Sequence, residues 1–173
     1  MKSRVSLIGP FVTTLLLLGA TANEIRQPHL KNGKNVILQI VTPEEMNKIL
    51  NENPDAVEMT ATRTRVEGRE MQPQGRAQIT YTLGTARAPG DRLVSTDSST
   101  NDFNVPTTLT AKTRYPSSGT GAVVTYVQIN VYQSNDNGRA YVTSGGIGST
   151  HIAVAVEAVK TYYFDFYSYI YGK

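Results

Sequence analysis

The chain has 173 residues, a formal net charge of +3 and no cysteine. This length suffices for one domain with an ordinary apolar core, which buries about 70% of the surface that the unfolded chain exposes. The lack of cysteine excludes disulfide bonds, thiol catalysis and thiolate metal sites, so stability has to come from apolar packing.

The first 22 residues have the pattern of a secretory signal peptide. Lys2 and Arg4 form a basic start, and a mostly apolar run follows from residue 5 to residue 18. This run is shorter than the ~20 residues that a bilayer crossing needs. We therefore expect removal of residues 1–22, secretion into the extracellular space and no later membrane contact. The small-x-small pattern assigns the cleavage to Ala20, Ala22 and Asn23.

Charge is low outside this segment. Without Lys2 and Arg4 the formal charge falls from +3 to +1. The densest basic cluster, residues 63–76, is interleaved with Glu67 and Glu70, whereas nucleic-acid binders usually present a dense basic face. The sequence therefore predicts no direct contact with nucleic acid.

Residues 23–75 form a polar N-terminal region with two short structured candidates. Residues 35–41, NVILQIV, fit a strand. Residues 42–50, TPEEMNKIL, fit a helix, because Thr42 and Glu45 make a capping box and proline occupies the first helical position. One helix face is apolar and would pack against the domain or bind a partner; it carries Met46, Ile49 and Leu50.

From residue 76 to residue 173 the hydrophobic period changes to two, which is typical of strands. Asn137-Gly138 is a strong hairpin signal, Val123 and Val127 are expected on one strand face, and residues 95–104 are expected to be a loop. The predicted fold is all-β, a small antiparallel β-sandwich or barrel, with the short helix in the N-terminal region. The predicted strands are residues 78–84, 122–133, 139–144, 151–159 and 161–172.

Residues 143–150 read TSGGIGST and place Gly145, Gly146 and Gly148 close together. A phosphate-binding loop would open a helix and usually carry a lysine or an acidic ribose ligand. Neither is present, and the next segment alternates like a strand. We expect these glycines to supply positive φ, a bulge or close backbone approach, with ligand binding as the alternative.

The last predicted strand, TYYFDFYSYIYG, has an unusual second face. Its more apolar face should pack inward, whereas the opposite face carries four tyrosines instead of the Lys, Glu or Thr that water-facing strands normally show. Tyrosine suits partly buried contact with protein or sugar. The alternative is coverage by the N-terminal region and its helix. The candidate interaction face consists of Tyr163, Tyr167, Tyr169 and Tyr171.

Patterns for catalysis and metal binding are scarce. His151 with Ser144 or Ser149 could act as base and nucleophile, but no nucleophile elbow surrounds them. Asp97 and Asp102 lack the spacing of a calcium loop, and paired histidine ligands for transition metals are missing. We therefore predict no enzyme activity, no catalytic residue, no cofactor and no metal.

The stretch Thr80 to Gly172 resembles the insect multiprotein bridging factor type two family, which also takes in proteins described as salivary secreted peptides. The resemblance lies in a Gly-Asp-Arg-Leu segment, a strand leading to an Asn-Gly turn, a Gly-Gly-x-Gly loop and a terminal aromatic strand ending Tyr-Gly. It implies a transcription activator that bridges a DNA-bound factor and the general transcription machinery. The β domain would then be residues 76–173.

Three functions from different classes follow. The signal pattern favours a secreted, non-enzymatic β-domain protein that binds a protein or glycan partner in insect haemolymph, saliva or another secretion. The family resemblance implies the nuclear coactivator instead. A third alternative is a tyrosine-rich structural component of an extracellular matrix or secretion. Because translocated protein does not ordinarily reach the nucleus, the sequence alone favours the first function.

Overall fold

The computed structural model describes residues 36–40, 44–65 and 75–173, with side chains from residue 44 onward. The described part contains one helix and eight strands. They are β1 (Val36–Ile40), α1 (Glu44–Glu52), β2 (Val57–Glu58), β3 (Thr60–Arg65), β4 (Ala77–Leu83), β5 (Arg92–Tyr115), β6 (Val124–Gln133), β7 (Gly138–Gly145) and β8 (Ile152–Gly172).

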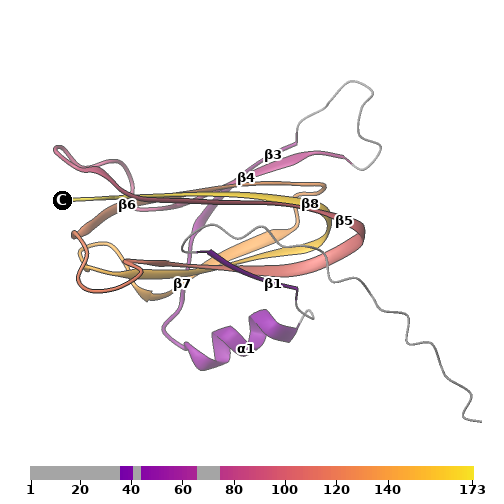
Figure 1. Ribbon diagram of the computed structural model, residues 1–173, viewed down its shortest axis with the longest axis horizontal. Coiled ribbons are helices and arrows are strands. Elements are labelled where there is room, and N and C mark those ends of the chain that lie inside the picture. Colours follow the sequence, from indigo (N-terminus) through magenta and orange to yellow (C-terminus); the bar gives the residue numbers. More distant parts are fainter. Residues whose placement is uncertain (1–35, 41–43, 66–74) are drawn as a thin grey trace, which may run out of the picture.

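Two long strands, β5 and β8, form the frame of the fold. They pair antiparallel along most of their length, and both bend so that each passes from one sheet layer into the other (Figure 1). The upper layer of Figure 1 has the order β3-β4-β6-β8-β5, and the lower layer has the order β2-β7-β8-β5-β1. The result is a nearly closed, barrel-like antiparallel sheet, which confirms the predicted all-β class.

The bend coincides with irregular backbone geometry. Lys160 of β8 has a φ of 50°, which is uncommon for a residue with a side chain. The register between β5 and β8 shifts twice between residues 102 and 109. The buried hydroxyl of Thr161 accepts a hydrogen bond of 3.0 Å from the backbone N–H of Ser134. The two strands predicted on either side of residue 160 are therefore one bent strand.

The core lies between the layers and consists of cross-strand rows of inward-facing side chains. In the upper layer, Ile79, Val131 and Phe166 stand side by side in register, and all three are fully buried. Each such large side chain contributes about 1.5–3 kcal/mol on burial. The matching row of the lower layer is smaller and equally buried; it consists of Ala111, Val156 and Ala140.

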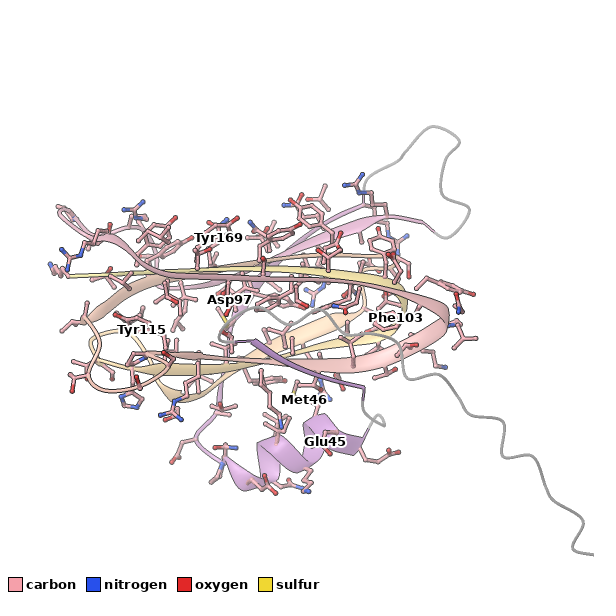
Figure 2. The ribbon with its side chains drawn as sticks, viewed as in Figure 1. Glu45, Met46, Asp97, Phe103, Tyr115 and Tyr169 are labelled. Atoms are coloured by element: carbon pink, nitrogen blue, oxygen red, sulfur yellow. The ribbon has the colours of Figure 1, made fainter. Side chains whose placement is uncertain are left out.

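Helix α1 lies on the outer face of the lower layer (Figures 1 and 2). Met46 and Ile49 are buried against Ala155 of β8, with Leu50 and Tyr141 partly buried beside them. The small alanine leaves room on the sheet that the two larger helix side chains fill. The apolar helix face therefore packs on the domain, at the opposite side from the last tyrosines.

Strands from both sides of residue 76 share this sheet. Strand β1 pairs with β5, β2 with β7, and β3 with β4. The described residues on the two sides of the predicted boundary at residue 76 are thus joined by main-chain hydrogen bonds.

Three local predictions are wrong. Asn137-Gly138 closes no hairpin, because β6 pairs with β4 and β8 whereas β7 pairs with β2 and β8. This turn therefore links the two layers.

The strand face predicted for Val123 is also wrong. A register shift between Val124 and Tyr126 turns Val124 into the core and leaves Val123 exposed, away from the buried Val127. Residues 95–104 belong to β5, since backbone pairing with β8 outweighs their loop-like composition.

Candidate interaction face

The outer face of the upper layer carries rows of uncharged polar and aromatic side chains. In register, Thr80 stands beside Asn130, which stands beside Tyr167, and Figure 2 shows Tyr169 pointing away from the core. We call this surface the tyrosine–threonine face. Its residues are Thr60, Thr62 and Thr64 of β3, Gln78, Thr80 and Thr82 of β4, Tyr126, Gln128, Asn130 and Tyr132 of β6, Asp165, Tyr167, Tyr169 and Tyr171 of β8, and Thr96, Ser98 and Thr100 of β5.

Side chains on this face hold one another in place. The Thr80 hydroxyl donates to Asn130 Oδ1 at 3.1 Å, and Gln128 Nε2 donates to the same oxygen at 3.1 Å. Tyr132 and Tyr167 meet edge to face with ring centroids 6.1 Å apart, an arrangement worth about 0.5–1.5 kcal/mol beyond burial. Groups that are already ordered lose less conformational freedom when a partner binds.

Three cross-strand rows of this face, its central rows, run from β3 to β5, and together they carry one charged side chain, Asp165. Burial, and then the charge of nearby Asp102, raise the pKa of Asp165 above its ordinary value. At the border, the Arg76 guanidinium lies 5.9 Å from the centroid of the Tyr132 ring. The face therefore offers shape and hydrogen bonds to a partner more than it offers charge.

One end of the face becomes apolar beside the connecting loops. The rings of Tyr126 and Tyr171 lie 6.0 Å apart, and Leu93 stands opposite Tyr171 in register. Ile147 reaches the same glycine, Gly84, that Tyr126 contacts. Leu93 and Ile147 are 48% and 47% exposed, and clustered exposed apolar groups mark interaction sites. We call Leu93, Tyr126, Ile147 and Tyr171 the loop-end patch.

Arg87 borders the loop-end patch. Its guanidinium lies 3.8 Å from the centroid of the Tyr171 ring and donates to Asp91 Oδ1 at 2.8 and 2.6 Å. Asp91 also accepts a hydrogen bond of 3.0 Å from Thr125. The hydrogen bond from Arg87 is the main cause that lowers the pKa of Asp91, so this arginine is held in place over the aromatic ring.

Of the four predicted tyrosines, three belong to this face: Tyr167, Tyr169 and Tyr171 are half-buried in its rows. Tyr163 lies further along β8 near the bend, opposite Asp102, and among the described residues its buried hydroxyl has no hydrogen-bond partner. Sequence reasoning missed Tyr126 and Tyr132, although the alternation of residues 122–133 could have shown them. Nothing in the sequence pattern places Leu93 and Ile147 beside them. That these tyrosines bind a partner stays a prediction.

The glycine loop has the backbone of a tight connection between β7 and β8. Gly145, Gly146 and Gly148 have φ values of 68°, 134° and 83°, a region that side chains disfavour. The N–H groups of Gly146, Gly148 and Ser149 donate to backbone carbonyls at 3.1, 2.8 and 3.0 Å. These three donors are thus used within the protein and do not converge on a common point.

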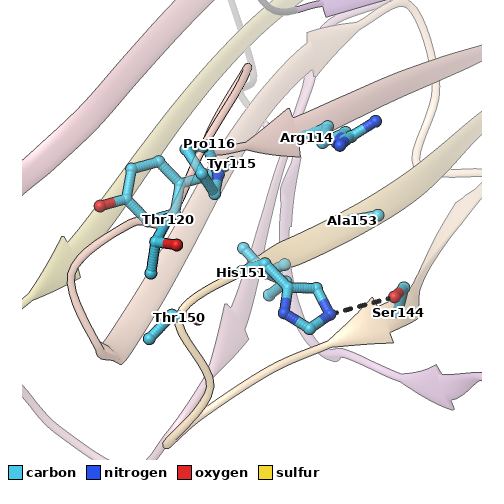
Figure 3. Close-up of a pocket in the computed structure, with 10 residues that line it drawn as sticks. Arg114, Tyr115, Pro116, Thr120, Ser144, Thr150, His151 and Ala153 are labelled. Atoms are coloured by element: carbon cyan, nitrogen blue, oxygen red, sulfur yellow. Dashed lines mark hydrogen bonds between the residues drawn. The ribbon is translucent and has the colours of Figure 1, made fainter.

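Ser144 and His151 do meet, in an open cavity of about 370 Å³ at the outer face of the lower layer (Figure 3). Ser144 Oγ lies 3.4 Å from His151 Nε2, and both residues are exposed. A catalytic base needs a third group to orient it, and no carboxylate lines this cavity. The absence of enzyme activity remains a prediction.

The two aspartates considered for calcium lie on opposite faces of β5. Asp97 is buried between the layers, as Figure 2 shows, whereas Asp102 is exposed. Side chains on opposite faces of one strand cannot share a cation. Across the described parts of the chain, no group of three or more His, Asp or Glu side chains is placed to hold a metal.

These features define an all-β protein with a polar, aromatic sheet face that carries little charge. A family model described as Transcription activator MBF2 matches residues 84–172, just over half the chain. The chain therefore belongs to the MBF2 transcription activator family. No match was found among curated proteins or among solved structures.

Membership in this family overturns the prediction of a secreted protein. A transcription activator works at nucleic-acid-bound machinery inside the cell. The predicted extracellular location, the extracellular partner or matrix role, and the expectation of no direct nucleic-acid contact therefore conflict with the family and are wrong. The charge and hydropathy of residues 1–22 predict secretion, whereas the family of residues 84–172 indicates a transcription activator. Residues 1–23, with Ala20, Ala22 and Asn23 among them, lie outside the described part.

A helix that spans a membrane needs a minimum length and hydrophobicity. Helix α1 has nine residues, and no described helix is long and apolar enough to span a bilayer.

Proposed function

We propose that the chain is a transcription coactivator that bridges a DNA-bound factor and the general transcription machinery through protein contacts. The observation that carries this proposal is the tyrosine–threonine face, a broad outer sheet surface that no described element covers, in a member of a transcription activator family.

The composition of the face supports a role in protein contact. Tyrosine is enriched at protein interfaces, and antibody binding loops combine it with serine and asparagine, because tyrosine adds large contact area with few rotatable bonds and the small polar groups adapt their hydrogen bonds. The loop-end patch adds exposed Leu93 and Ile147 beside Tyr171. Tyrosine and arginine are enriched among the residues that contribute most to binding at protein interfaces, and Arg87 lies over Tyr171.

Because the face carries little charge, we expect its binding to a partner to depend little on salt concentration. Binding that neutralises phosphates weakens steeply as salt rises. A contact made by tyrosine, threonine and amide side chains, with Asp165 as the charged member of the central rows, should change little over the same salt range. Salt dependence therefore separates partner contact at this face from contact with nucleic acid.

Bridging requires no chemistry by the protein itself. Ser144 and His151 are exposed, and the residues lining their cavity include no carboxylate that could orient the histidine. We accordingly propose a non-enzymatic protein.

A tethering assay tests the proposal. The chain is fused to an unrelated DNA-binding domain, and transcription of a reporter with matching sites is measured. The fusion should raise transcription above that of the DNA-binding domain alone. Excess untethered chain should lower it again, because free bridging protein occupies the partners separately. A fusion that leaves transcription unchanged, or activation that excess free chain does not reduce, would contradict bridging.

A further inference from the structure

The cavity on the lower layer lies where the sheet carries a small side chain, and no residue of helix α1 is among those that line it. Outward-facing positions of β8 carry Ala153 and Ala155, and each leaves room above the sheet. Met46 and Ile49 of α1 occupy the room above Ala155. The helix ends at Glu52, where a cavity of about 290 Å³ lies over Lys112 and Arg114, and the cavity of about 370 Å³ lies next to it, above Ala153.

Hydrogen-bond donors stand on opposite sides of this cavity. The register places Arg114 of β5 and Ser144 of β7 on either side of Ala153, as Figure 3 shows. His151 stands next to Ser144, and the hydroxyl of Thr150 also lines the cavity.

The electrostatics of the cavity favour an anion. No Asp or Glu is among the residues that line it; the acidic residue Glu52 lines the adjoining cavity, which Arg114 also borders. Among the described residues Arg114 has no ion-pair partner, whereas its strand neighbour Lys112 lies 4.0 Å from Glu45 of α1. An arginine without a counter-ion, together with neutral donors in a concave site, attracts a charged acceptor.

We infer that this cavity binds a phosphate group, free or carried on a phosphorylated side chain. The terminal oxygens of phosphate point in several directions, so it can accept hydrogen bonds from Arg114 on one side and from Ser144 and His151 on the other. A carboxylate has two oxygens in one plane and matches such opposed donors less well. The guanidinium of arginine suits a phosphate acceptor because it can donate two parallel hydrogen bonds. This site is separate from the tyrosine–threonine face and independent of the proposed function.

The experiment is a titration of the isotope-labelled full chain, followed by amide NMR. The probes are inorganic phosphate and O-phosphoserine, with chloride at equal ionic strength and serine as blanks. Saturable shifts should gather at Arg114, Ser144 and Ala153. Tighter binding of phosphoserine assigns the site to a phosphorylated side chain, and equal or tighter binding of inorganic phosphate assigns it to free phosphate.

Variants test the cause of binding. Arg114→Gln should weaken binding about tenfold or more, since a charge-assisted hydrogen bond is worth roughly 1.5–3 kcal/mol. Ala153→Leu should block the cavity. Lys112→Gln makes the same charge change two residues away and should bind like the wild type. Spectra of the variants away from the site report whether each is folded. The inference is overturned by an absence of saturable shifts in the wild type, or by equal weakening in Arg114→Gln and Lys112→Gln.

Discussion

The guanidinium of Arg63 on β3 donates a hydrogen bond of 2.8 Å to the carbonyl of Gly138 at the start of β7. A second bond, from Arg63 Nε to the Asp136 carbonyl, measures 3.2 Å. Because β3 belongs to the upper layer and β7 to the lower layer, this one side chain ties the layers together at an edge of the sandwich.

Replacing Arg63 should therefore loosen that edge. Arg63→Ala removes both bonds to backbone carbonyls, and we expect the free energy of unfolding to fall by about 1–2 kcal/mol in urea titrations. Arg65→Ala is the matched control, because its ion pair with Asp136 is exposed on the arginine side and exposed pairs contribute little. Equal losses in the two variants would show that Arg63 does not join the layers.

The glycine loop gives a second prediction, based on two different local environments. A side chain at Gly145 would collide with the carbonyl of His151, whereas one at Gly148 would meet open space. Both positions have positive φ, so alanine at either adds backbone strain of about 1 kcal/mol. Gly145→Ala should lower the melting temperature clearly more than Gly148→Ala. The reverse order would disprove the close approach of the loop to His151.

The carboxyl of Asp165 should make stability fall as pH rises. Burial, and then Asp102, raise the pKa of Asp165, so the folded state holds this proton more tightly than the unfolded state. Its stabilising contribution is therefore complete below the ordinary aspartate pKa and is lost as pH rises through the raised value. We expect Asp165→Asn to melt higher than the wild type at neutral pH, with a difference that shrinks in acid. If Asp165→Asn melts lower than the wild type at neutral pH and its relative stability rises in acid, the raised pKa of Asp165 is contradicted.

Local pattern predicted the element types well, because alternation and helix capping act over a few residues. The strands around Ile79, Ile129 and Phe166 follow from period two. The bend at Lys160 and the passage of β5 and β8 between layers depend on pairing between distant segments, which one sequence does not display. For the same reason the Asn137-Gly138 turn predicted a hairpin where the chain changes layer.

The candidate face was predictable only where it lies on one strand. Alternation alone separates Tyr167 and Tyr169 from buried Phe166. The register with β6 and β4 adds Asn130 and Thr80 to the same rows, and the loop connections bring Ile147 toward Tyr126. Such neighbours come from strand order, and strand order is a property of the whole fold.

The central claim is that the tyrosine–threonine face binds a protein partner in transcription, and the double variant Tyr167→Ser, Tyr169→Ser tests it most directly. These side chains are half-buried at outward-facing positions, so their removal should lower the melting temperature moderately, mainly through loss of the Tyr132–Tyr167 ring contact, and leave the domain folded. The tethered double variant should nevertheless lose the activation of the wild-type fusion. A fusion with Lys48→Ser and Glu52→Ser, two exposed positions of α1 on the opposite side, should keep it. Full activation by a folded double variant would contradict the account.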